Sequence, residues 1–220
     1  MPVLFIPLVF FAFVVLFVIL FFYQNKKEKE RTKALEIAAA QLGWSFSPGA
    51  PLNMMGDLSR FPLFNQGYGR KIKNFMYGQA KGVKAAVFDY QYTVGGGKSS
   101  HTYFQSVVYL EPANLNLPFF SLRPENFIHK MLGAFGYQDI DFGQRPDFSK
   151  NYLLRGQDEN SIRQAFNDQV LAFYESYGGT CTDAGANQIF LFRSGNRLEP
   201  HEIQGYVGVG LQLTNLLQRY

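Results

Sequence analysis

The sequence predicts an α+β fold in which a transmembrane helix precedes one soluble domain built from an antiparallel sheet and packed helices. An unbroken apolar run of about 20 residues opens the chain. Three β-rich runs then follow one another across short turns, before segments with helical periodicity begin. A chain of 220 residues has room for one well-buried domain beside the apolar run. We therefore expect a transmembrane anchor at 1–24, a charged helical stalk at 25–43 and an α+β domain at 44–220.

The apolar run at residues 3–22 reads VLFIPLVFFAFVVLFVILFF, which as a helix matches the roughly 30 Å hydrocarbon core of a bilayer. A cleaved secretory signal needs a basic segment before such a run and small residues at a cleavage site after it, and neither is present. A buried core helix rarely continues so far without a polar residue. We expect the segment to remain attached and to cross the membrane once.

Basic residues crowd the C-terminal side of this run. They form a predicted membrane-surface basic cluster of Lys26, Lys27, Lys29, Arg31 and Lys33, and no basic side chain precedes the run. Because basic flanks favour the cytoplasmic side, the pattern predicts an inner (plasma) membrane protein with its N-terminus outside and its domain in the cytoplasm. The lipid bilayer is therefore the first expected partner.

Charge is uneven along the rest of the chain. Residues 37–110 contain seven basic and two acidic side chains, whereas residues 111–220 contain nine basic and twelve acidic. The positive half could lie against an anionic inner leaflet, or its lysines could be solvated residues of edge strands. No aromatic-basic signature of a nucleic-acid module is present, so nucleic acid is not an expected partner.

Three strands are predicted at 71–80, 83–94 and 101–111, because each run is rich in β-branched and aromatic residues and partly alternates. Lys81-Gly82 is typical of a tight hairpin turn, and residues 95–100 have the glycine content of a hairpin loop. These short connections predict antiparallel pairing.

Helices and short strands alternate downstream. Asp158 is a good N-cap for an amphipathic helix over 159–177. A last helix is expected from Pro200, with the stripe Ile203, Val207, Leu211 and Leu217, although this stretch also alternates with period two. We further expect irregular chain at 47–69, strands at 119–124 and 151–156, a short helix at 125–136, and one or two strands within 180–193.

The stretch YTVGGGKSSHTY at 92–103 suggests a phosphate-binding loop at first sight. A P-loop needs a glycine where Tyr92 stands and a helix after the Lys-Ser pair, where a strand is predicted. Both requirements fail. Glycines 95–97 are therefore interpreted as turn formers, and no cofactor is expected.

Candidate catalytic and metal-binding residues are few. Asp89 and His101 could meet on neighbouring strands beside Ser99, which would suit a membrane-bound hydrolase, but no G-x-S-x-G nucleophile elbow is present. Asp139 and Asp141 form a D-x-D pair, a spacing that holds a metal in some glycosyltransferases, and two carboxylates alone are weak support for a metal.

Two further features, a lone cysteine and a set of aromatic residues, can be interpreted structurally as well as functionally. The lone Cys181 lacks the surroundings of a nucleophile and is interpreted as a structural thiol. Aromatic residues on facing strands could line a ligand groove, but such residues more often stabilise a sheet. They are Phe88, Tyr90, Tyr92, Tyr103 and Tyr109.

The segments LGWSF, GYGRKIKN, VFDYQYTVGGGKSSHT, FFSLRPE and GYQDIDFG together resemble a group of uncharacterised bacterial proteins that share one N-terminal span and one cytoplasmic domain of unknown function. The resemblance covers most of residues 34–215. It implies a bacterial source and a single-pass anchor, and it transfers no catalytic or binding role.

The sequence thus favours a membrane-anchored protein whose cytoplasmic α+β domain binds another protein or a ligand without catalysis. The alternative is the membrane-bound hydrolase that uses Asp89, His101 and a nearby serine.

Overall fold

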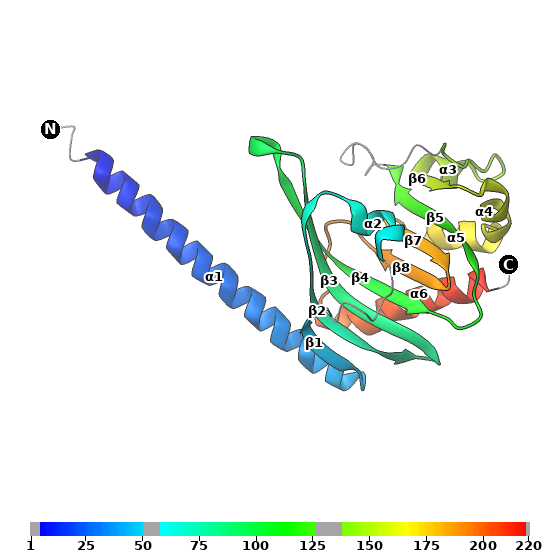
Figure 1. Ribbon diagram of the computed structural model, residues 1–220, viewed down its shortest axis with the longest axis horizontal. Coiled ribbons are helices and arrows are strands. Elements are labelled where there is room, and N and C mark those ends of the chain that lie inside the picture. The colour runs from blue at the N-terminus through cyan, green and yellow to red at the C-terminus, as the bar shows by residue number, and fades with distance from the viewer. Residues whose placement is uncertain (1–4, 51–57, 126–137, 219–220) are drawn as a thin grey trace.

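The computed structural model describes residues 5–50, 58–125 and 138–218. One long helix leads into a domain that combines a single antiparallel sheet with short helices, as the α+β prediction requires (Figure 1). The helices are α1 (Phe5–Gln41), α2 (Pro62–Asn65), α3 (Pro146–Asn151), α4 (Glu159–Ala165), α5 (Asp168–Ser176) and α6 (Ile203–Leu217). The strands are β1 (Ser45–Gly49), β2 (Tyr68–Ala80), β3 (Val83–Val94), β4 (His101–Glu111), β5 (Leu117–Pro124), β6 (Tyr152–Gly156), β7 (Cys181–Ala186) and β8 (Gln188–Phe192).

Helix α1 is continuous from the apolar run into the domain. Its N-terminal half projects away from the sheet (Figure 1), and the apolar window is exposed along its whole length, with a mean hydropathy of 2.0. The helix is thus long and apolar enough to cross a membrane. Its C-terminal half packs on the domain through Leu35, Ala38 and Ala39, which are buried. The predicted stalk is therefore helical, and its last turns are part of the domain core.

The sheet has the strand order β1-β2-β3-β4-β8-β7-β5-β6, and all its pairs are antiparallel. The three predicted strands are present as β2, β3 and β4, and they pair antiparallel as expected. Lys81 and Gly82 both have positive φ, 50° and 81°, which is the backbone of a two-residue hairpin turn that matches sheet twist. The predicted hairpin at this point is confirmed.

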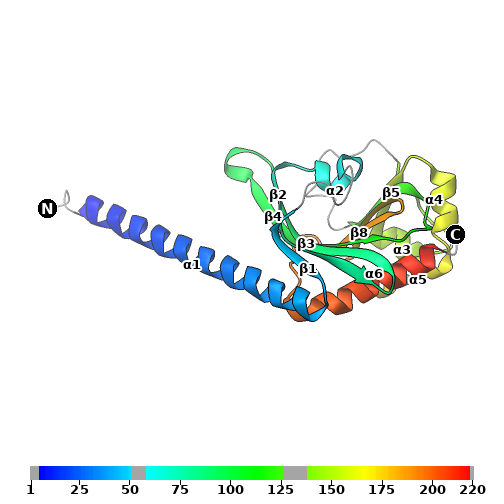
Figure 2. The same ribbon diagram turned by 60° about the horizontal axis from the view of Figure 1, so that its bottom comes forward.

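Each face of the sheet carries its own apolar cluster. One face packs against the end of α1 and against α4, α5 and α6, and the predicted stripe of α6 lies inside this cluster. The other face carries mainly aromatic side chains, which α2 covers in part (Figures 1 and 2). Residues of β3 alternate between the two, so that Ala85 and Val87 face α1 and Phe88 and Tyr90 face α2.

Two local expectations differ from the structure, and the expectation of one or two strands within 180–193 is confirmed. The predicted helix over 159–177 is two helices, because the side chain of Asn167 accepts hydrogen bonds from the N–H groups of Gln169 and Val170 and so starts α5 anew. Residues 45–49, part of which was expected to be irregular, form β1 and pair with β2. Both parts of the 180–193 region are strands. The helix expected at 125–136 lies almost entirely outside the described residues.

The hairpin turn gives a first prediction for stability. Gly82→Ala is expected to lower the free energy of unfolding by about 1–2 kcal/mol, because an alanine Cβ disfavours positive φ, while no atom lies near enough to clash. Gly96→Ala is the matched control, since Gly96 has φ −146° and open space around it. Urea unfolding of the full chain in lipid nanodiscs measures both, and equal losses for the two variants would contradict the assignment.

Candidate functional site

A buried ion pair joins the anchor helix to the sheet. Arg31 of α1 donates from Nε to Oδ2 of Asp89 and from Nη2 to Oδ1, both at 2.8 Å, so the two side chains meet in bidentate geometry. The side chains are only 11% and 9% exposed. Strand alternation explains the direction of Asp89, because it shares the face of Ala85 and Val87, toward α1.

Two side chains from neighbouring strands complete the carboxylate's partners. Asn74 donates to Oδ2 at 2.9 Å, and Ser106, which is opposite Asp89 in the β3–β4 register, donates to Oδ1 at 2.8 Å. Asn74 has φ 51° at an irregularity of β2 between Lys73 and Met76. Asparagine tolerates this left-handed conformation better than most residues, and the bulge aims its amide at Asp89.

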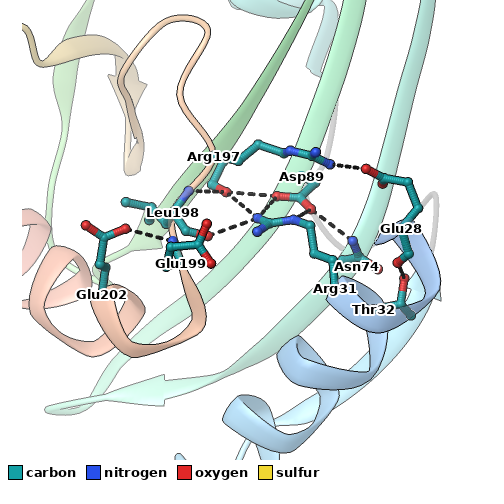
Figure 3. Close-up of polar contacts among 10 residues, drawn as sticks. Glu28, Arg31, Thr32, Asn74, Asp89, Arg197, Leu198, Glu199 and Glu202 are labelled. Carbon is teal, nitrogen blue, oxygen red and sulfur yellow. Dashed lines mark hydrogen bonds and ion pairs between the residues drawn. The ribbon is translucent and has the colours of Figure 1, made fainter. Parts of the chain in front are cut away.

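The loop after β8 closes the site from the other side (Figure 3). Nη2 of Arg31 donates to the carbonyl of Leu198 at 3.0 Å, and the N–H of Leu198 donates to Oγ of Ser106 at 3.0 Å. We call Arg31, Asn74, Asp89, Ser106 and the backbone of Leu198 the anchor junction. It brings together one helix, three strands and one loop, from parts of the chain up to 167 residues apart.

The charges of the anchor junction stabilise each other. Burial alone would raise the pKa of Asp89, but the hydrogen bonds and the charge of Arg31, with the bonds from Asn74 and Ser106, hold that pKa below its ordinary value. Burial would likewise lower the pKa of Arg31, but the hydrogen bond and the charge of Asp89 outweigh this effect and hold the pKa of the guanidinium above its ordinary value. Both groups are therefore ionised at neutral pH, in a place where an unpaired charge would be costly.

A second contact lies one turn earlier on α1. Glu28 accepts from Nη1 of Arg197 at 2.7 Å, and the guanidinium carbon of Arg197 lies 5.6 Å from the ring centroid of Phe104. Figure 3 shows Arg197 and Glu28 beside the Arg31–Asp89 pair. Helix α1 is thus held on the sheet at two successive turns, which fixes the direction in which the apolar half leaves the domain.

The predicted basic cluster divides in the structure. Lys26, Lys27, Lys29 and Lys33 are exposed along α1. Arg31 does not belong with them, because its side chain turns into the domain and pairs with Asp89. The predicted membrane-surface basic cluster is therefore corrected to the four lysines, without Arg31.

The residues of the hydrolase alternative do not come together. In the β3–β4 ladder, Asp89 lies opposite Ser106 and His101 lies opposite Val94. Asp89 and His101 are thus offset by five residues along the strands, which corresponds to roughly 17 Å at the rise of a strand. His101 packs edge-on against the ring of Tyr103, and Oγ of Ser99 donates to the carbonyl of Gly96. The carboxylate of Asp89 is engaged by the anchor junction, so these residues form no catalytic arrangement.

The D-x-D pair is engaged in local structure. Oδ1 of Asp139 accepts from the N–H of Leu154 at 2.9 Å, and burial raises the pKa of this carboxyl group. The carbonyl of Asp141 accepts from Arg163. Within the described ranges, no three His, Cys, Asp or Glu side chains are grouped so that they could hold a metal ion.

The aromatic residues and the glycine loop have structural roles. Phe88, Tyr90, Tyr92, Tyr103 and Tyr109 are all buried in the aromatic cluster, where they stabilise the sheet. Tyr90 also borders a shallow groove beside Lys71 and Lys73. The glycine loop leads through a short 3-10 turn at Gly97–Ser99 directly into β4. No helix follows the Lys-Ser pair, which removes the amide groups that a phosphate loop needs.

Cys181 on β7 is fully buried, and burial raises the pKa of its thiol to about 11. We expect maleimide at pH 7 to leave this thiol unmodified in the native protein and to modify it completely in denaturant, because only the exposed thiolate reacts. A His101→Cys variant supplies the control, since residue 101 is exposed and its thiol should react at once. Rapid labelling of the unaltered native chain would contradict the burial of Cys181.

Comparisons with known proteins support the fold. No family model matches the chain, and no curated protein matches it. Among solved structures, the chain is similar to the crystal structure of the mycobacterial trehalose monomycolate transport factor A, TtfA, with a TM-score of 0.59 and 13% sequence identity. The similarity covers 85% of this chain and 94% of that chain. At this identity the likeness shows a shared fold alone.

Proposed function

We propose that this chain is a single-pass inner-membrane protein that holds its α+β domain against the cytoplasmic membrane surface, where the domain binds a partner without catalysis. The observation that supports it most is the anchor junction. A flexible linker would leave the domain free to tumble. Here α1 is one continuous helix from the apolar run to the domain, and the Arg31–Asp89 pair fixes it to the sheet.

The second contact, between Glu28 and Arg197, sets the distance between domain and lipid. Glu28 lies six residues after Phe22, the end of the apolar run, which corresponds to a rise of roughly 9 Å along the helix. Arg197 and Phe104 are therefore held at about this height above the hydrocarbon, through their contacts with Glu28 and each other. This height is close to one Debye length at physiological salt, roughly 8 Å.

Basic side chains lie next to the contact between Glu28, Arg197 and Phe104. Lys71 and Lys73 are exposed on β2 and line a shallow groove together with Glu28, Phe104 and Arg197. Each lysine or arginine close to an anionic leaflet contributes about 1 kcal/mol of attraction. Figures 1 and 2 show that the hairpin between β3 and β4 extends toward the side of the N-terminal half of α1. We propose that this hairpin and the exposed end of β2 rest on the lipid headgroups.

Hydrogen exchange of the full chain in nanodiscs tests the lipid contact. We expect anionic lipid to slow the exchange of residues 68–73 and 95–104 relative to zwitterionic lipid, and the Lys71→Gln/Lys73→Gln variant to remove most of the difference. Lys84→Gln is the control, because Lys84 is exposed near the opposite end of β3. Identical exchange in both lipids would overturn this contact.

A reporter fused to the C-terminus tests the orientation. A cytoplasmic domain makes a fused fluorescent protein bright and leaves fused alkaline phosphatase inactive, because the phosphatase needs the oxidising outer compartment. We expect this result from the basic flank Lys26 to Lys33. Active phosphatase with a dark fluorescent fusion would reverse the proposed orientation.

The partner that we propose is another protein at the same membrane. The structural neighbour is described as a transport factor, and an accessory role beside a membrane process suits an anchored domain whose candidates Asp89, His101 and Ser99 do not come together. Cross-linking in intact membranes followed by purification of the full chain tests this proposal. Recovery of the chain with lipid alone, under conditions that retain a known membrane complex, would count against a protein partner.

A further inference from the structure

A cleft opens at the other end of the sheet from the anchor junction, between the segment that leads into α2 and the strands β5 and β6. Its volume is about 380 Å³, which lies at the lower end of the range for small-molecule sites. Arg60, Phe61, Phe119, Ser121 and Arg155 are among its lining residues. None of its lining residues belongs to the anchor junction.

The floor of the cleft is apolar and closely packed. The ring of Phe119 packs closely on β7, since a Cβ at Gly185 would come within 2.3 Å of it, and the residue is still 39% exposed. Phe61 and Ala184, beside it, are fully buried. The ring centroids of Phe61 and Phe119 are 5.8 Å apart. An exposed aromatic ring on a buried apolar floor can accept the hydrocarbon part of a ligand.

Two arginine residues line the cleft beside this floor. The guanidinium carbon of Arg60 lies 5.2 Å from the ring centroid of Phe119, and Arg155 lines the cleft from β6. No acidic side chain is among the described residues that line the cleft. A pair of positive charges beside apolar surface matches a ligand with an anionic head and an apolar tail.

The segment that carries Arg60 and leads into α2 is held in place by a buried aspartate of β7. The N–H of Leu63, in α2, donates to Oδ2 of Asp183 at 2.7 Å, and Asp183 pairs with Arg123 at 2.7 Å on the face of the sheet that α2 covers. Both charged side chains of this pair are at most 7% exposed. The short helix next to the cleft is thus fixed before any ligand arrives, and such preorganisation favours binding.

We propose that this cleft binds a small single-chain amphiphilic anion, with its carboxylate or phosphate head between Arg60 and Arg155 and its chain over Phe119. The inference goes beyond the proposed protein partner, because it adds a small-molecule ligand to the binding function. It does not depend on the orientation of the domain or on the hairpin contact with lipid.

Photo-crosslinking tests the site in the full chain. The probe is decanoate with a diazirine on its chain, added to the protein in zwitterionic nanodiscs and mapped by mass spectrometry. We expect labels in peptides that contain residues 58–64 and 117–124. Unlabelled decanoate and decyl phosphate should each compete, and the stronger of the two identifies the preferred head group. Equal competition by decanol or decyltrimethylammonium would overturn the anionic site, as would labels confined to α1.

Arginine variants separate recognition from folding. Arg60→Gln is expected to weaken competition by decyl phosphate about tenfold, the cost of one lost hydrogen bond to a charged group. Arg163→Gln is the matched control, because Arg163 is also exposed and its guanidinium carbon lies 5.3 Å from the ring centroid of Phe142. Protection of Cys181 from maleimide verifies that each variant is folded. Equal affinity of both variants would overturn the role of Arg60, whereas the topology and hydrogen-exchange results would stand.

Discussion

Asp89→Ala is expected to destabilise the domain by about 3–5 kcal/mol and to release the C-terminal half of α1 from the sheet. The reason is that Arg31 would keep its charge in a place where it is 11% exposed and has lost its carboxylate. Asn74 and Ser106 would lose the same acceptor. Urea unfolding of the full chain in nanodiscs, followed through the exposure of Cys181 to maleimide, measures the change.

Glu159→Ala is the control for this effect. Glu159 pairs with Arg163 within α4 at 2.7 Å, but the two side chains are 54% and 40% exposed. Such a surface pair contributes about 0.5 kcal/mol or less. Similar losses for Asp89→Ala and Glu159→Ala would show that the anchor junction is no stronger than a surface ion pair.

The pH dependence of the junction follows from the lowered pKa of Asp89. The contribution of this carboxylate is complete at neutral pH, because the group is then ionised in both the folded and the unfolded chain. It declines as the pH falls below the ordinary value of 3.8 toward the lower pKa of the folded state, since the unfolded chain takes up the proton first. The difference in stability between the unaltered chain and Asp89→Asn should therefore shrink in this acid range.

The second large effect is expected from charge in the apolar run. Val15→Asp together with Ile19→Asp should prevent stable insertion, because an aspartate near the centre of a membrane helix costs about 3 kcal/mol and Ile19 places a second charge within the same apolar run. Both residues are exposed on α1 and have no packing role in the domain. Flotation of cell membranes through a density gradient measures insertion, and the variant is expected to stay at the bottom.

Ile37→Asp is the control for the inserted charges. Ile37 is an exposed apolar residue of the same helix, 51% exposed, but it lies beyond the apolar run and beside the domain. This variant should float with the membranes as the unaltered chain does. If the Val15/Ile19 variant also floats, α1 is not the part that holds the protein in the membrane.

Most of the fold could be predicted because its signals are local. The apolar run, the alternation of 83–94 and 101–111 and the Lys81-Gly82 turn each report on a few neighbouring residues, and the structure confirms them. The two wrong predictions, one continuous helix over 159–177 and irregular chain from residue 47, also have local causes. Asn167 is a competing N-cap inside an amphipathic pattern, and β1 is too short and too rich in serine, glycine and proline to show a period.

The anchor junction was harder to predict because its partners are distant in sequence. Arg31 and Asp89 are 58 residues apart, and Arg31 stands among other charged residues of α1. One signal was nevertheless present. Arg31 precedes Leu35 by four residues and so continues the stripe that packs on the domain, while Asp89 is on the inward face of β3. The periodicity of each element thus points both charges inward, but no local rule pairs them.

Electron spin resonance between two labels tests the rigid connection most directly. Gln24→Cys on α1 and His101→Cys at the start of β4 take the labels, and Cys181 is buried, so we expect it to stay unlabelled. In nanodiscs we predict one narrow distance distribution, which becomes broad in the Asp89→Ala variant as the helix loses its attachment. A distribution that is equally broad with and without Asp89 would contradict the account, because the domain would then hang freely from its membrane helix.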